Sequence, residues 1–338
     1  MYFALTEDQR EFDGAVRGYL AERFDLDAVR GVVESPDSDG HPASLWKAAA
    51  EQGWLAALVP EEHEGLGLGL VEAQVIARAL GAGVAPGPWR GTVLAAEAVR
   101  LAGTPEQRQT WLPRLAAGDA VGAFTLRGAA PGTLRAVEYG GVADVVVARS
   151  ADGLTLVEGA TATPQGSYDG TVRLAALDAG AGTELPGATA EVIAELTARA
   201  TVLTAADLVG IARQAVDRTV AYDREREQFG VPVGSFQAVK HALADLHVSV
   251  TLAEHAVLYA AHAVDIALDD AALAVAVAKA KASDAALDAT AAMIQYHGGI
   301  GYTWEHETHF FYKRAKRLAG QYGDADTQRA RIAELTIG

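Results

Sequence analysis

Three long segments in the second half of the chain carry apolar residues at helical spacing, and short turns separate them. They comprise residues 200–226, 237–268 and 271–295. Because each segment is much longer than an average globular helix and is followed by a brief turn, neighbouring helices must run antiparallel and bury their apolar stripes against one another. Half of the 338 residues are hydrophobic and many are alanine, which favours helices. The pattern predicts an antiparallel bundle of long helices.

The first third of the chain is also predicted to be helical, with short breaks. Thr6 is followed three residues later by Gln9, which is the pattern of a capping box at a helix N-terminus. Thr104 precedes Pro105, so a cap residue is followed by proline at the first helical position. These start signals and the apolar periodicity between them predict helices over most of residues 6–118.

Between residues 118 and 188 the helical periodicity is lost and glycines become frequent. Apolar or β-branched runs occur at 143–149, 154–157 and 172–174, and Gly or Asp bounds them, as is typical of short strands. The order helical, β, helical predicts an α+β fold that is mostly α. The expected domains are an N-terminal helical domain (1–118), a reduced middle β domain (119–188) and a C-terminal helical bundle (189–338).

Charge and composition exclude several classes of function. The net charge of −16 argues against nucleic acid or an anionic membrane as the main partner, because both require clustered Lys and Arg. The chain has no cysteine, which excludes disulfides and thiol chemistry. It shows neither a signal peptide at its start nor an apolar run long enough to span a bilayer. We expect a cytoplasmic protein that does not enter membranes.

Two motifs carry residues suited to a dinucleotide. Residues 224–237 spell R-E-R-E-Q-F-G-V-P-V-G-S-F-Q, and residues 295–316 spell Q-Y-H-G-G-I-G-Y-T-W-E-H-E-T-H-F-F-Y-K-R-A-K. A guanidinium at Arg226, in a turn between two helices, can clamp a pyrophosphate with two parallel hydrogen bonds. The glycines at 298–301 allow the backbone to approach a phosphate closely. The alternative is that Arg226 forms a surface ion pair and the glycines only end a helix.

In this order along the whole chain, the motifs and helical segments resemble the acyl-CoA dehydrogenase family. The resemblance implies FAD as cofactor, and an oligomer in which the C-terminal domain of one subunit reaches the ADP part of the FAD seated in its neighbour. The residues of this chain that match those ADP contacts are Arg226, Gln228, Phe229, Gln237, Gln295, Gly298 and Gly299.

The same resemblance implies that the base is missing. Family members remove an α-proton from an acyl-CoA with a Glu, and one family position for it corresponds to Tyr322, before Gly323. The other corresponds to Ala200. The family's T-E-P segment beside the flavin ring is represented by Thr125-Leu126-Arg127, of which only the threonine matches. We therefore expect no catalytic residue of the family type in this chain.

The missing base and the retained ADP contacts lead to one hypothesis. The chain resembles the short non-catalytic subunit of actinobacterial heteromeric (α2β2) enzymes that dehydrogenate steroid side-chain CoA thioesters. That resemblance implies a homologous catalytic partner subunit that carries the base and receives the acyl-CoA. It also implies that electrons pass to an electron-transfer flavoprotein or a similar acceptor.

Two alternatives remain open. The chain could be a self-sufficient homomeric flavin dehydrogenase with Asp324 as a relocated base, because a buried carboxylate can acquire a suitable pKa. It could also be a flavin-free scaffold protein. His306 and His309 invite a metal assignment, but they stand closer together than the histidines of the zincin motif, so no metal site is expected.

Overall fold

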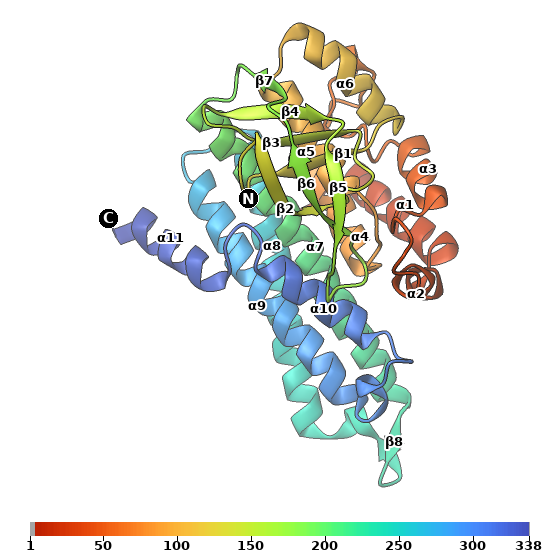
Figure 1. Cartoon of the computed structure of the whole chain (residues 1–338). Coiled ribbons are helices and arrows are strands. Elements are labelled where there is room, and N and C mark those ends of the chain that lie inside the picture. The colour runs from red at the N-terminus through yellow and green to blue at the C-terminus, as the bar shows by residue number, and fades with distance from the viewer. Residues whose placement is uncertain (1–3, 338) are drawn as a thin grey trace. The chain divides into compact units, whose positions relative to one another are not determined.

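The computed structural model describes residues 4–337, and the order of its helices and strands is helical, β, helical (Figure 1). The helices within that range are α1 (Glu7–Arg23), α2 (Leu26–Val33), α3 (Ala43–Glu51), α4 (Leu70–Ala82), α5 (Trp89–Ala102), α6 (Pro105–Ala117), α7 (Ala190–Glu225), α8 (Gln237–Asp265), α9 (Ala271–His297), α10 (Thr308–Ala319) and α11 (Ala325–Ile337). Short 3₁₀ turns occupy Glu61–His63 (η1), Val233–Ser235 (η2) and Ile300–Tyr302 (η3). The strands are β1 (Gly122–Thr125), β2 (Gly132–Glu138), β3 (Val145–Arg149), β4 (Leu154–Glu158), β5 (Thr161–Gln165), β6 (Leu174–Ala179), β7 (Thr183–Leu185), β8 (Glu227–Gln228) and β9 (Val231–Pro232).

Both predicted helix starts are confirmed by their capping contacts. The Thr6 hydroxyl accepts from the Gln9 amide at 3.2 Å, and the Gln9 side chain accepts from the Thr6 amide at 2.9 Å. Thr104 and Gln107 form the same reciprocal pair before α6. Each box satisfies two backbone N–H groups that a helix start otherwise leaves without a partner. Local sequence alone therefore specifies where these two helices begin.

The middle block forms two small sheets. One has the strand order β1-β3-β4-β7, with β1 and β3 parallel and the other pairs antiparallel, and the second has the order β2-β6-β5. Residues from both sheets, among them Leu134, Val146 and Leu177, meet in one buried apolar cluster. Burying one face of each sheet against the other removes apolar surface from water and stabilises strands that are only three to seven residues long.

The strand predicted over residues 172–174 begins later than expected. In the structure β6 starts at Leu174 and continues to Ala179. The preceding residues form a turn, because the Asp169 carboxylate accepts from both the amide and the hydroxyl of Thr171. The Arg173 guanidinium is held by backbone carbonyls that include that of Ser38, 135 residues away. An Asx turn of this kind competes with strand pairing and delays the strand.

The chain divides into two compact units. The first, here called the helical unit, comprises the residues up to Arg30, Gln74–Ala85, and the residues from Thr201 onward. The second comprises Gly31–Ala73 and Pro86–Ala200. Each unit draws on separate stretches of sequence, so the three domain boundaries proposed from the sequence remain a prediction.

Within the helical unit, α4 and α7 cross with their backbones in contact. A Cβ at Gly81 would lie 2.2 Å from the carbonyl oxygen of Asp207, and one at Gly210 would lie 2.0 Å from a carbonyl oxygen of α4. Only glycine fits at either position. Beside the crossing, the Arg314 guanidinium donates to both carboxylate oxygens of Asp207 and to the carbonyl of Ala85. A buried bidentate pair with its donors satisfied in this way fixes α10 against α7.

None of the helices within residues 4–337 combines the length and the apolar character that a membrane crossing requires.

Candidate dinucleotide-binding site

The first motif forms a hairpin that projects beyond the end of α7 (Figure 1). Strands β8 and β9 pair through a tight turn at Phe229 and Gly230, whose φ angles are +57° and +77°. Two successive positive φ values match the twist of a two-residue hairpin. The Val233 amide closes the base of the hairpin by donating to the Arg226 carbonyl at 2.7 Å. As a result Phe229 stands at the tip, with 94% of its surface exposed.

The second motif ends α9. Gly298 follows the last helical residue with φ +63° and ψ −140°, a conformation that side chains strongly disfavour. A Cβ at Gly298 or Gly299 would meet nothing within 4 Å, so the backbone there faces open space. Gly301 differs, because a Cβ there would lie 2.7 Å from the Ile294 carbonyl oxygen. The first two glycines leave room for a ligand, whereas the third serves packing.

The structure brings the two motifs together at one end of the helical unit. The Tyr222 ring, one helical turn before Arg226, stacks on His297, which directly precedes Gly298, with ring centroids 4.4 Å apart. The helix α8 that starts at Gln237 follows immediately from the hairpin. All seven predicted cofactor contacts are therefore carried by elements that meet at this end: Arg226, Gln228, Phe229, Gln237, Gln295, Gly298 and Gly299.

These residues are exposed, and most of their polar atoms are not used within the chain. Among residues 4–337, the guanidinium of Arg226 and the amides of Gln237 and Gln295 have no side-chain hydrogen-bond partner. Gln228 makes one exposed bond, to the carbonyl of its neighbour Glu227. The contacts within residues 4–337 therefore do not support the alternative that Arg226 forms an ion pair on the surface of this chain. A free guanidinium, three amides and an open glycine backbone fit the pyrophosphate and ribose of an ADP group.

Both positions that the resemblance assigns to a base hold other residues in other roles. Ala200 is completely buried in α7. The carboxylates near it in the same compact unit, Glu97 and Glu195, are held by the guanidinium of Arg199. Tyr322 has φ +54° and its carbonyl accepts from the Gln328 side chain.

Asp324 caps a helix in the structure, which disfavours it as a relocated base. One carboxylate oxygen accepts from the amide of Thr327 at 2.9 Å and from its hydroxyl at 2.7 Å, at the start of α11. These bonds, together with nearby Lys279, lower the pKa of Asp324. A base would need a raised pKa, as burial would produce, and Asp324 is exposed.

Lys279 has a structural role that the sequence did not reveal. Its side chain is fully buried, and the ammonium donates to the Ser283 hydroxyl and to the carbonyls of Ala319 and Gly323, at 2.9 to 3.0 Å. Burial lowers the pKa of Lys279 to about 8, and Asp324 opposes that shift. All three protons of the ammonium are used, so Lys279 anchors the loop that carries Tyr322. The sequence signal for this role is a lysine that lies within an alanine-rich apolar stripe.

His306 and His309 belong to an aromatic cluster. The His306 ring contacts His297 at 4.7 Å between centroids, and His309 stacks on Trp304 at 4.3 Å. Burial lowers the pKa of each of these three histidines. Within the described part of the chain, no group of three or more His, Cys, Asp or Glu side chains is arranged to hold a metal ion.

The β block shows how the surviving threonine of the T-E-P segment is used. The Thr125 hydroxyl accepts from the Arg127 amide at 3.2 Å, in a local turn that follows β1. The hydroxyl is therefore engaged within its own turn, in the segment that the resemblance places beside the flavin ring. The neighbouring residues are Leu126 and Arg127 rather than Glu and Pro. The local geometry therefore gives no positive support for a flavin ring held by this chain.

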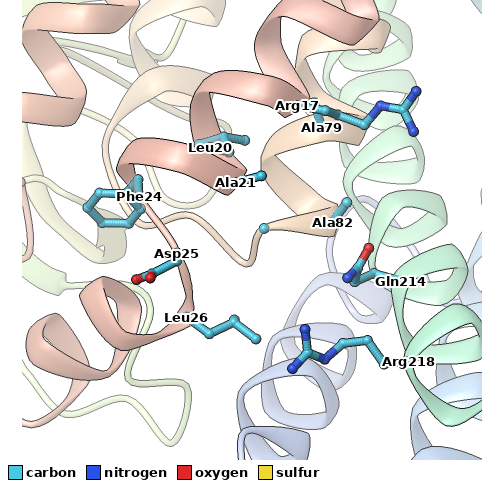
Figure 2. Close-up of a pocket in the computed structure, with 11 residues that line it drawn as sticks. Arg17, Leu20, Ala21, Phe24, Asp25, Leu26, Ala79, Ala82, Gln214 and Arg218 are labelled. Atoms are coloured by element: carbon cyan, nitrogen blue, oxygen red, sulfur yellow. The ribbon is translucent and has the colours of Figure 1, made fainter. Parts of the chain in front are cut away.

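The helical unit also contains a separate cavity of about 340 Å³ (Figure 2). Leu20 and Ala82 contribute apolar walls, and Gln214 and Arg218 reach toward it from α7. Asp25 also lines it, but its carboxylate caps α2 by accepting from two backbone amides. The predicted cofactor contacts are not among the residues that line this cavity. It is distinct from the site formed by the two motifs.

Comparisons with known proteins identify the family to which this chain belongs. The N-terminal domain model of acyl-CoA dehydrogenases matches residues 6–119, and the C-terminal domain model matches residues 190–336. The acyl-CoA dehydrogenase IpdE2 of Mycobacterium tuberculosis is 37% identical over 313 residues, which cover 91% of either protein.

Two solved structures are similar over nearly the full length. One is the ChsE4–ChsE5 complex from Mycobacterium tuberculosis, with 26% identity and a TM-score of 0.91 over 99% of this chain and 98% of that one. The other is the Tcur3481–Tcur3483 steroid ACAD, with 27% identity and a TM-score of 0.87 over 98% of each chain. From the matched domains, the extent of the sequence identity and the fold, this chain belongs to the acyl-CoA dehydrogenase family of oxidoreductases.

Proposed function

We propose that this chain is the auxiliary subunit of a heteromeric acyl-CoA dehydrogenase. In this proposal its two motifs grip the ADP part of an FAD seated in a partner subunit, and the partner supplies the base that removes the α-proton of the acyl-CoA. The FAD supplies the hydride acceptor when it is bound. An electron-transfer flavoprotein or a similar carrier then takes the electrons.

The observation that carries the proposal is the exposure of the motif residues. Arg226 and Gln237 have hydrogen-bonding groups that nothing within residues 4–337 satisfies, and Phe229 is almost fully exposed at a hairpin tip. An exposed aromatic ring and a guanidinium without a partner contribute little to the stability of the chain by itself. The arrangement is useful if a ligand or subunit outside this chain covers it.

The occupants of the two base positions support a non-catalytic role. Tyr322 and Ala200 cannot accept a proton as a carboxylate does, and Asp324 is held as a helix cap. The absence of a family-type base supports an arrangement in which a partner subunit deprotonates the acyl-CoA. It also disfavours the self-sufficient homomer that depends on Asp324.

The comparisons support the heteromeric assembly and suggest the substrate. Two similar structures are named as pairs of proteins, ChsE4–ChsE5 and Tcur3481–Tcur3483, and the second is described as a steroid ACAD. We extend these descriptions to this chain as a proposal: the partner is a homologous acyl-CoA dehydrogenase subunit, and the substrate is a bulky acyl-CoA such as a steroid side-chain CoA thioester.

The flavin content of the native assembly tests the proposal directly. This chain purified alone should contain little FAD, whereas the assembly with its partner should be yellow and active, with one FAD for every two chains. The FAD absorbance, compared with the amount of each polypeptide, measures this ratio. A homomer of this chain that is fully flavinated and oxidises acyl-CoA would refute the proposal.

The guanidinium of Arg226 provides the corresponding mutational test. Arg226→Ala should weaken FAD retention by the assembly roughly 10- to 100-fold, because a charge-assisted bidentate contact with pyrophosphate is lost. Arg224→Ala is the matched control, since Arg224 is an exposed arginine two residues away on the end of α7. Equal FAD retention by the two variants would contradict the assignment, and a complete absence of FAD in every assembly would favour the scaffold alternative.

A further inference from the structure

The two motifs are joined by side chains that are not among the predicted cofactor contacts. The Tyr222 ring of α7 stacks on the His297 ring of α9, with an interplanar angle of 20°. His297 in turn packs against His306 from the segment that follows the glycines, at 58°. Tyr222 precedes Arg226 by four residues, and His297 immediately precedes Gly298. This stack therefore connects the end of α7, which leads to Arg226, with the end of α9, which leads to Gly298.

An ion pair joins the same elements a second time. Arg218 of α7 donates to the carboxylate of Glu307, which follows His306. Burial acts to raise the pKa of Glu307, but backbone hydrogen bonding and the charge of Arg218, together with His306 when it is protonated, outweigh it and lower the pKa. Glu307 therefore remains ionised and paired with Arg218 at physiological pH.

Hydrogen bonds fix the neutral tautomer of each histidine. His297 Nδ1 lies 2.7 Å from the Met293 carbonyl, which can only accept, so Nδ1 carries the proton. His306 Nδ1 accepts from the Thr308 amide at 3.3 Å, so this nitrogen has a lone pair. A proton added to His306 Nδ1 would break that bond and turn the nitrogen toward Glu307, whose carboxylate lies 3.8 Å away.

We infer that Tyr222, His297 and His306, together with the Arg218–Glu307 pair, form a clasp that holds the Arg226 hairpin and the Gly298–Gly299 turn at the spacing required by one dinucleotide. His297 is the positioning residue at its centre. The inference rests on the proposed function, because it concerns how the same ADP contacts are kept in place. The clasp requires neutral His297 and His306, and it opens at acidic pH.

The direction of the pH dependence follows from the groups that surround the stack. Burial lowers the pKa of both His297 and His306, and the positive charge of Arg218 acts in the same direction on each. Arg30 also lowers the pKa of His306, whereas Glu307 raises both values. A histidine with a lowered pKa stabilises the folded arrangement above its unfolded pKa, and this contribution is lost as the pH falls through the folded value. FAD should therefore dissociate more readily as the pH falls through the lowered pKa values of these two histidines.

The test measures FAD dissociation from the native assembly between pH 5 and pH 8, using the fluorescence of released flavin. His297→Ala removes the stack and should raise the dissociation constant about tenfold at pH 8, since an aromatic stack between two binding segments is lost. His297→Phe keeps a ring but does not titrate. It should retain most of the affinity and show a flatter pH profile. His255→Ala, at an exposed histidine of α8, is the control.

Measuring Arg226→Ala in parallel separates this inference from the proposed function. If Arg226→Ala weakens FAD retention and both His297 variants behave like the parent protein at every pH, the clasp is refuted and the ADP contact stands. If Arg226→Ala has no effect, the proposed function fails first. A thermal melt of each variant shows whether the protein is folded.

Discussion

Two parts of the helical unit differ in whether their polar side chains are hydrogen-bonded within the chain. At the motif end, Arg226 and Gln237 are exposed and their side chains have no hydrogen-bond partner within residues 4–337. Around the loop that follows α10, the ammonium of Lys279 uses all three protons and Asp324 caps α11. Of these polar side chains, those of the first part form no hydrogen bonds within the described chain, whereas those of the second part are hydrogen-bonded to other groups of the same chain.

This difference shows which part of the chain has polar groups available to bind a ligand or another subunit. Exposed polar groups on an ordered scaffold can exchange water for a ligand at little cost. Groups already engaged in buried bonds would have to break them first, and an unmade buried bond is expensive. The loop at Tyr322 is therefore a structural element, and the motif end is the part available for binding. The following changes test this contrast, in order of expected effect.

Lys279→Ala should have the largest effect on stability. It leaves the Ser283 hydroxyl and two carbonyls without their donor in a buried site, and it opens a cavity, so about 3 kcal/mol of unfolding free energy should be lost. Urea unfolding of this variant against Lys281→Ala measures the difference, because Lys281 is an exposed lysine on the same helix. Near-equal stability of the two variants would show that the loop does not depend on Lys279.

Asp223→Asn should stabilise the protein at high pH. Asp223 is 1% exposed, and neither of its carboxylate oxygens has a hydrogen-bond partner within the described chain. Burial raises the pKa of Asp223 to about 6. A folded-state pKa above the unfolded one means that stability falls as the pH rises through the interval between them, from about 4 to 6.

The Asn variant lacks this titration. Its unfolding free energy should exceed that of the parent protein by roughly 1–2 kcal/mol at pH 8 and by much less at pH 4.5. Chemical unfolding at the two pH values measures the change. A gain of the same size at both values would mean that charge burial at Asp223 is not its cause.

Asp324→Ala should cause a smaller loss of stability and leave turnover unchanged. The substitution removes the side-chain acceptor at the start of α11, and caps of this kind make a modest contribution to stability. Asp326→Ala is the control, because Asp326 lies in the first turn of the same helix and does not cap it. Loss of acyl-CoA oxidation by the assembly with Asp324→Ala, but not with Asp326→Ala, would revive the homomeric alternative.

Phe229→Ala should change the stability of the chain least of all. The ring is 94% exposed and its described contact is an edge-on approach to Phe236, so unfolding should shift by less than about 0.5 kcal/mol. FAD retention by the assembly should still fall several-fold, because the ring packs against the ligand or partner in our proposal. A variant that loses stability but keeps its FAD would reverse the contrast drawn here.

Much of the fold follows from signals confined to a few neighbouring residues. The capping boxes at Thr6 and Thr104, the apolar stripes of α8 and α9, and the loss of helical period in the β block all lie within short windows of sequence. The two motifs were also visible because each is compact. Such features can be predicted because the physical interaction that stabilises them joins residues close in sequence.

The roles of individual polar residues could not be predicted in this way. Asp324 looked like a candidate base and is a helix cap, while Lys279 was hidden in an alanine-rich stripe and anchors a loop 44 residues away. The Arg173 guanidinium is held by the carbonyl of Ser38, 135 residues away. The contacts of Lys279 and Arg173 depend on which distant groups become neighbours.

The sequence by itself determined the order of the blocks, the helix starts and the residues available to contact a dinucleotide, since these depend on local geometry and residue chemistry. Only the tertiary structure decided which of those polar groups remain available. Burial and pairing are set by contacts between distant segments, such as the stack of Tyr222 on His297, and a hydrogen bond made inside the chain removes that group from binding outside it.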